Sequence, residues 1–119
     1  MKNFLNGLRD SNIEIETLRA EREYMLRLDT PETRLRAGDL EKKIDVIVKK
    51  QIAASDAIGA LSDPVAQCVL KRRYIIGEAW RSIAKSMKSS ERNLHYIRDS
   101  ALPELAETLR KVMNENDEM

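Results

Sequence analysis

Apolar residues recur in alternating steps of four and three along residues 39–61, and this spacing constrains the fold more than any other feature of the chain. The repeating positions are Leu40, Ile44, Ile47, Gln51, Ala54, Ile58 and Leu61. A seven-residue repeat of this kind predicts a long helix whose apolar seam packs against another helix. Gln51 is the one polar interruption in the seam. Val48 and Ile52 widen the apolar stripe, so we expect this helix to contact more than one partner.

Residues 3–28 carry a less regular version of the same pattern. Their apolar positions are Leu5, Leu8, Ile15, Leu18, Met25 and Leu28. Residues 29–38 contain a proline and a glycine and are expected to form a ten-residue connector between the two helices. We therefore predict an antiparallel helical hairpin, resembling a coiled coil, over residues 1–61. This arm is also expected to join copies of the chain into a homo-oligomer, most simply a dimer.

The composition suits an all-α protein. Charged residues make up 34% of the 119 residues and aromatic residues only 4%, a profile typical of helices with long solvated faces. Cys68, the single cysteine, lies in an apolar run and is expected to be a buried small hydrophobe. The sequence holds no CxxC pair or histidine cluster, so neither a metal nor a cofactor is expected.

The N-terminus turns polar too early for a signal peptide, and no apolar run approaches the ~20 residues that cross a membrane. A cytoplasmic protein without a membrane partner is therefore expected. An enzyme is not expected, because the chain has one histidine, no glycine-rich phosphate loop and no nucleophile with a neighbouring base.

The near-neutral net charge of +1 conceals a strongly basic segment. Residues 71–98 hold eight Lys and Arg residues against two Asp and Glu residues, whereas residues 99–119 hold two against six. A concentrated basic segment in a nearly neutral chain is the electrostatic pattern of a surface that faces phosphate.

The basic segment coincides with two short helical patterns joined by a polar turn. Apolar positions at Trp80, Ile83, Ala84 and Met87 are followed by Leu94 and Ile97, with Lys-Ser-Ser between them. This spacing predicts a helix-turn-helix, in which Ala84 allows the two helices to cross closely. The predicted core of the unit is Tyr74, Trp80, Ile83, Ala84, Met87, Leu94 and Ile97. The alternative is a plain bundle of small helices.

Helix-start and helix-stop signals set the expected limits of this second domain, residues 62–113. A helix over residues 64–76 should begin at Asp63-Pro64 and end at Gly77. Ser89 or Ser90 should cap the next-to-last helix. That helix should end near Ala101, because Pro103 cannot continue it without losing a hydrogen bond. A terminal helix should then run from Pro103 into an acidic tail at residues 114–119, which is expected to be disordered.

Several spaced elements of residues 63–105 resemble a known family. They are Asp63-Pro64, Val69 to Ile75, Trp80 to Ala84, Ser90 to Arg92, and Ala101-Leu102. Together they resemble sigma-factor region four and, more closely, small phage and prophage regulators of the RinA and ArpU type. The resemblance implies a DNA-binding transcriptional regulator of late phage genes.

Successive 100° steps place a set of polar residues opposite the predicted core. The residues expected to read bases are Arg92, Asn93, Tyr96 and His95. The residues expected to contact phosphate are Arg81, Lys85, Lys88 and Arg98. The leading hypothesis is a dimeric regulator on double-stranded DNA, with RNA polymerase as a further partner. The alternatives are a small terminase subunit that binds phage DNA for packaging, and a sigma-like module that binds polymerase without binding DNA.

Overall fold

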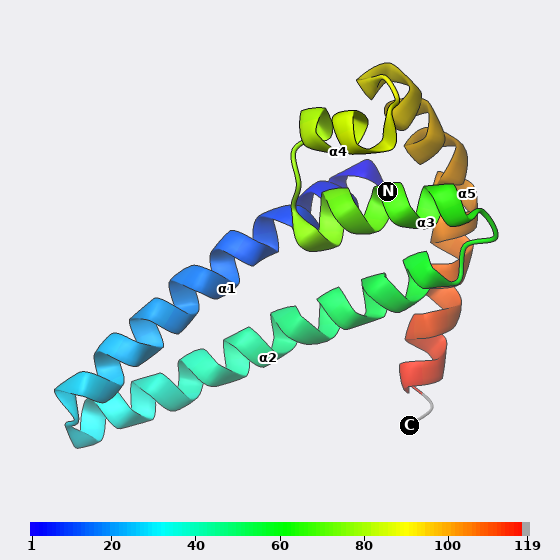
Figure 1. The fold of residues 1–119 in the computed structure, drawn as a ribbon. Helices are drawn as coiled ribbons and strands as arrows, with labels where there is room; N and C mark the ends of the chain where they lie inside the picture. Colours follow the sequence, from blue (N-terminus) through cyan, green and yellow to red (C-terminus); the bar gives the residue numbers. More distant parts are fainter. Residues whose placement is uncertain (118–119) are drawn as a thin grey trace.

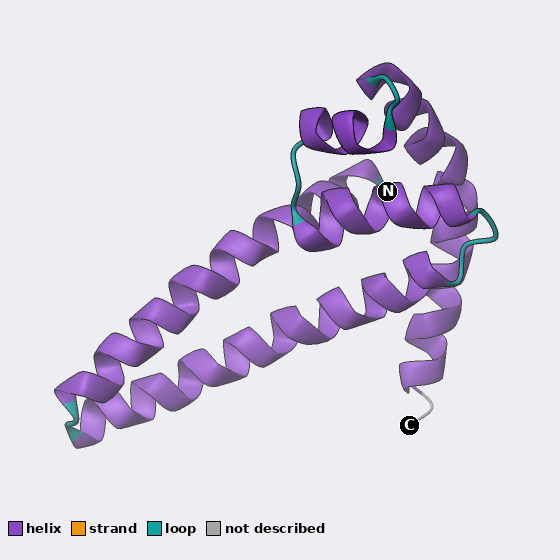
Figure 2. Cartoon of the chain, viewed as in Figure 1, coloured by secondary structure: helices purple, strands orange, loops and turns teal. Residues whose placement is uncertain are grey.

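The computed structural model describes residues 1–117, and over this range the chain is all-helical, as expected (Figures 1 and 2). The elements are α1 (Lys2–Leu28), α2 (Pro31–Gly59), α3 (Pro64–Leu70), the π-helix η1 (Lys71–Ile76), α4 (Trp80–Met87) and α5 (Glu91–Asp117). None of the helices in the described part of the chain is both long and apolar enough to cross a membrane.

Helices α1 and α2 run side by side in opposite directions and form a long projection (Figure 1). Only Asp29 and Thr30 link them, so the expected ten-residue connector was wrong. Pro31 is the first residue of α2, where its missing N–H costs no hydrogen bond. Thr30 caps this helix, because its hydroxyl accepts from the Thr33 N–H at 3.1 Å while the Thr33 hydroxyl accepts from the Thr30 N–H at 2.9 Å.

Polar side chains in the seam between α1 and α2 pair across it. The Gln51 side-chain amide donates to Ser11 Oγ at 2.9 Å and to Asn12 Oδ1 at 2.8 Å. Nearer the far end of the projection, Arg22 Nη1 lies 2.6 Å from Glu41 Oε2. Both polar interruptions thus have a partner across the seam, although Nε of Arg22 is buried without one among the described residues.

The main core joins both parts of the chain. Its buried side chains come from α1, α2, α3, η1, α5 and the link between α2 and α3, and they are Leu5, Leu8, Ala54, Ala57, Ile58, Leu61, Ala66, Leu70, Tyr74, Ala101 and Leu105. Side chains from residues 1–61 and from residues 62–113 therefore share one apolar cluster. This shared packing anchors the base of the projection to the shorter helices.

Helix α5 continues through Pro103 as far as Asp117, so the expected break near Ala101 was wrong. The helix survives the loss of one backbone hydrogen bond because side chains on both sides of the proline are buried, beginning with Ala101, which is 9% exposed. Leu105 is 1% exposed, and the Thr108 hydroxyl donates to the Ala57 carbonyl of α2 at 2.9 Å. The tail expected to be disordered is helical as far as Asp117, and the rest of it lies outside the described residues.

The segment expected as one helix over residues 64–76 consists of α3 and the π-helix η1. Asp63 caps its start by accepting from the Val65 N–H at 3.0 Å. Gly77 ends it with φ +94°, the left-handed conformation expected of it. Cys68 is exposed, contrary to expectation, because α3 buries the neighbouring face that carries Val69 and Leu70.

Candidate nucleic-acid interface

A small apolar cluster holds α4 against the start of α5. Val69, Ile83, Ala84 and Leu94 are buried in it. The partly buried side chains that pack against this cluster are Trp80, Met87 and Ile97. Tyr74 belongs to the adjoining main core, where its ring meets Trp80 edge-on at 6.1 Å. The structure therefore brings together all seven side chains that the sequence pattern assigned to this core.

Three residues, Lys88 to Ser90, connect α4 to α5. Lys88 adopts the left-handed conformation with φ 54° and ψ 47°, which costs a residue with a Cβ atom about 1–2 kcal/mol. The Ser89 N–H donates to the Ala84 carbonyl at 2.9 Å and closes the end of α4. Ser90 caps α5, because its hydroxyl accepts from the Asn93 N–H at 3.0 Å. These contacts fix the angle between the two helices.

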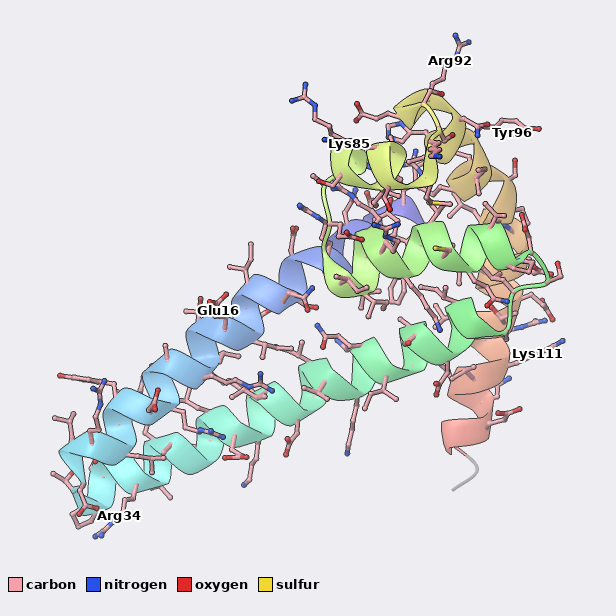
Figure 3. All side chains as sticks on the ribbon, in the orientation of Figure 1. Glu16, Arg34, Lys85, Arg92, Tyr96 and Lys111 are labelled. Atoms are coloured by element: carbon pink, nitrogen blue, oxygen red, sulfur yellow. The ribbon has the colours of Figure 1, made fainter. Side chains whose placement is uncertain are left out.

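Five residues expected to contact DNA are exposed on α4, the turn and the start of α5. They are Arg81, Lys85, Lys88, Arg92 and Tyr96. Figure 3 shows Arg92, Lys85 and Tyr96 projecting outward from this end of the molecule. The Tyr96 side chain is 70% exposed. None of the four cations forms an ion pair within the described part of the chain, so their charges are free to meet an external anion.

Asn93, also expected to read a base, is exposed but engaged with the turn. Its side-chain amide donates to Ser89 Oγ at 2.9 Å. The contact spans four residues, the spacing at which helical side chains meet. Asn93 therefore braces the start of α5 with one of its two amide N–H groups.

His95 and Arg98 lie against Trp80 instead of extending outward with Arg92 and Tyr96. The His95 ring meets the Trp80 ring edge-on, with 4.5 Å between the centroids. The Arg98 side chain is only 14% exposed, and its Cζ lies 5.5 Å from the Trp80 ring. The Arg98 guanidinium donates to Asp99 Oδ1 at 2.9 Å and to the Tyr74 hydroxyl at 3.4 Å. Both residues are thus part of the packing around Trp80.

An ion pair that sequence reasoning missed braces the entry to α4. Arg72 Nε donates to Glu78 Oε2 at 2.6 Å and Nη2 donates to Oε1 at 3.1 Å, while Nη1 reaches Ser86 Oγ at 3.0 Å. The hydrogen bonds from Arg72 lower the pKa of the Glu78 carboxyl. The pair spans the bend at Gly77 and ties η1 to α4. Side chains six residues apart do not meet on a helix, so only the expected bend at Gly77 could have indicated that Arg72 and Glu78 pair.

Comparisons of this chain with family models, with curated proteins and with solved structures find no match.

Proposed function

We propose that this chain is a sequence-specific DNA-binding transcriptional regulator that places the start of α5 in the major groove. The observation that carries the proposal is that four cations without an ion pair among the described residues are exposed, together with Tyr96, on α4, the turn and the start of α5. An α-helix fits the major groove of B-form DNA, and the second helix of a helix-turn-helix enters it with its N-terminal residues foremost.

The exposed residues divide into two roles. Arg92, in the first turn of α5, is placed to form two hydrogen bonds with the O6 and N7 atoms of a guanine. Tyr96, one turn later, is placed to contact a thymine methyl group or the backbone. Arg81, Lys85 and Lys88 lie on α4 and the turn, where they would contact phosphates and hold the unit in register.

We further propose that two copies associate through the arm at residues 1–61. The outward face of α1 carries Ile13, Tyr24 and Leu28, which are 66%, 52% and 48% exposed. Ile13 and Tyr24 are about three helical turns apart, and Tyr24 and Leu28 are about one turn apart, so all three side chains lie on one face of the helix. A two-fold dimer formed through this face would present two copies of α5 to two half-sites.

The direct test is the Arg92→Ala variant, assayed for binding to a duplex selected by the wild-type chain. We expect a loss of about 1–3 kcal/mol in specific binding and a relaxed preference at one base pair. Arg34→Ala is the matched control, because Arg34 is an exposed arginine at the far end of the arm (Figure 3). Equal loss in both variants, or no loss in either, would contradict the placement of α5 in the groove.

Assembly state separates this proposal from its competitors. Sedimentation should show a dimer that dissociates in the Ile13→Glu variant, while Ile76→Glu, an equally exposed site on η1, remains dimeric. A ring of eight or more copies would instead favour a small terminase subunit. A chain that binds RNA polymerase and no duplex at any salt concentration would be a polymerase-binding module.

A further inference from the structure

Two arginines from different helices stack on Trp80, and the charge of a third arginine acts on one of them. Arg73 of η1 and Arg98 of α5 place their Cζ atoms 5.0 Å and 5.5 Å from the Trp80 ring. Arg9 of α1 is close enough for its positive charge to lower the pKa of Arg73. We refer to Arg9, Arg73 and Arg98 as the arginine cluster. It lies where α1 passes beneath the α4–α5 unit, away from the exposed residues that are proposed to meet the major groove.

The arginine cluster has too little negative charge beside it. Asp99 is shared, with its carboxylate 2.9 Å from Arg98 and 3.4 Å from the Lys2 ammonium group. Arg9 and Arg73 form no ion pair with any residue that the structure describes. Desolvation and the charges of Arg9 and Arg98 all lower the pKa of Arg73. One shared carboxylate therefore stands against four cations.

Donor atoms in the same region are buried without partners. The Nε–H groups of Arg9 and Arg73 are buried and donate to no atom of the described residues, and Nε2 of His95 is also buried without a hydrogen-bond partner. Arg73 keeps one contact, from Nη1 to the Glu78 carbonyl at 3.1 Å. Buried polar groups in folded proteins nearly always find a partner, so unpaired donors beside uncompensated positive charge indicate a ligand that accepts hydrogen bonds.

We propose that the arginine cluster binds a phosphate group. Guanidinium groups present planar pairs of N–H donors that match phosphate oxygens, and two or three of them around one anion would supply the missing counter-charge. The phosphate comes either from a DNA backbone or from a free phosphorylated molecule. The DNA source rests on the proposed function, because it would add a backbone contact beside the α4–α5 unit. The free-phosphate source does not depend on that function.

Trp80 provides the readout, because it is the only tryptophan in the chain and two members of the cluster stack on it. Inorganic phosphate, and separately a duplex, would be titrated into the full chain at constant ionic strength while Trp80 emission is recorded. Wild type should give a saturable change with at least one of the two ligands. Arg9→Gln should bind that ligand at least tenfold more weakly, and Arg9→Lys should recover part of the affinity.

Arg19→Gln is the matched control, since it removes the same charge from an exposed site on the same helix and should behave as wild type. Circular dichroism establishes that each variant is folded. No saturable change in wild-type emission with either ligand, or equal affinity in folded Arg9→Gln and Arg19→Gln, would overturn the site. Duplex binding with no Trp80 change for either the duplex or inorganic phosphate would overturn the site and leave the proposed function standing. A phosphate response without duplex binding would support the site and contradict the proposed function.

Discussion

Leu94→Ala tests the packing that holds α5 against α4. Leu94 is fully buried, at 0% exposure, in the cluster formed with Val69, Ile83 and Ala84. The substitution removes every side-chain carbon beyond Cβ, which at about 0.8 kcal/mol for each carbon amounts to roughly 2.5 kcal/mol of lost burial. A residual cavity adds to this loss, so we expect the free energy of unfolding to fall by about 3 kcal/mol.

The assay is urea and thermal unfolding, followed by circular dichroism and by Trp80 fluorescence. An unfolding entropy of about 2.1 cal/mol/K per residue converts a 3 kcal/mol loss into a fall in Tm of roughly 12 °C for a chain of this length. The two signals should move together, because Trp80 contacts both apolar clusters.

Ile76→Ala is the control, since it truncates a large aliphatic side chain that is 67% exposed. It should cost less than about 0.5 kcal/mol. Equal effects of the two substitutions would refute the argument that Leu94 closes the α4–α5 unit. A fluorescence transition that shifts while the dichroism transition stays in place would show that the unit unfolds independently of the arm.

Two further substitutions test the turn and the bend beside it. Lys88→Gly should raise the free energy of unfolding by about 0.5 kcal/mol in urea titrations, because glycine removes the strain of the left-handed conformation. The net gain is small because glycine also increases the conformational entropy of the unfolded chain. The same change should reduce the slope of log K for duplex binding against log salt by about 0.9, and a less stable variant would show that the lysine itself supports the turn. Glu78→Gln should lower the urea midpoint at neutral pH, because the lowered pKa of Glu78 means that its pairing with Arg72 stabilises the fold only while the carboxyl is ionised. That contribution is lost as the pH falls through the lowered pKa, so the urea midpoints of wild type and variant should converge over that fall, and a difference that stays constant with pH would contradict the ion pair.

The all-α class of the fold and the buried faces of its helices were predictable because both depend on the local periodicity of apolar residues. The seam of α2, the cap at Asp63, the left-handed Gly77 and the seven core residues around Trp80 all follow from residues within a few turns of one another. Each of these signals acts through the backbone or through one helix face. No knowledge of distant contacts was needed to recognise them.

Two errors in the helix bounds arose near prolines, because the effect of a proline depends on its position in the helix. The connector was expected to run from Asp29 to Gly38, whereas Pro31 is already the first residue of α2, where its missing N–H costs nothing, and the helix continues through Gly38. Pro103 was taken as a helix end, whereas contacts of Leu105 and Thr108 with the rest of the fold hold α5 together across it. A proline within a helix removes one backbone N–H donor, and tertiary packing decides whether the helix continues past it.

The arginine cluster and the inward placement of His95 and Arg98 could not be read from the chain. Arg9, Arg73 and Arg98 lie on three different helices, and only the packing of α1 against η1 and of η1 and α5 around Trp80 relates them. A helical wheel for α5 alone places Arg98 near the edge of the core. It cannot show that the indole of α4 provides a surface on which that arginine stacks.

Selection of duplexes from a random-sequence pool, carried out with the full chain at two salt concentrations, tests the central claim most directly. The proposed major-groove binding by Arg92 and Tyr96 predicts enrichment of a defined sequence at both concentrations, with affinity falling steeply as salt rises. Dimerisation through the arm predicts that the enriched sequence contains two related half-sites. Recovery of unenriched sequences at low salt and of no duplex at higher salt would contradict sequence-specific recognition by α5.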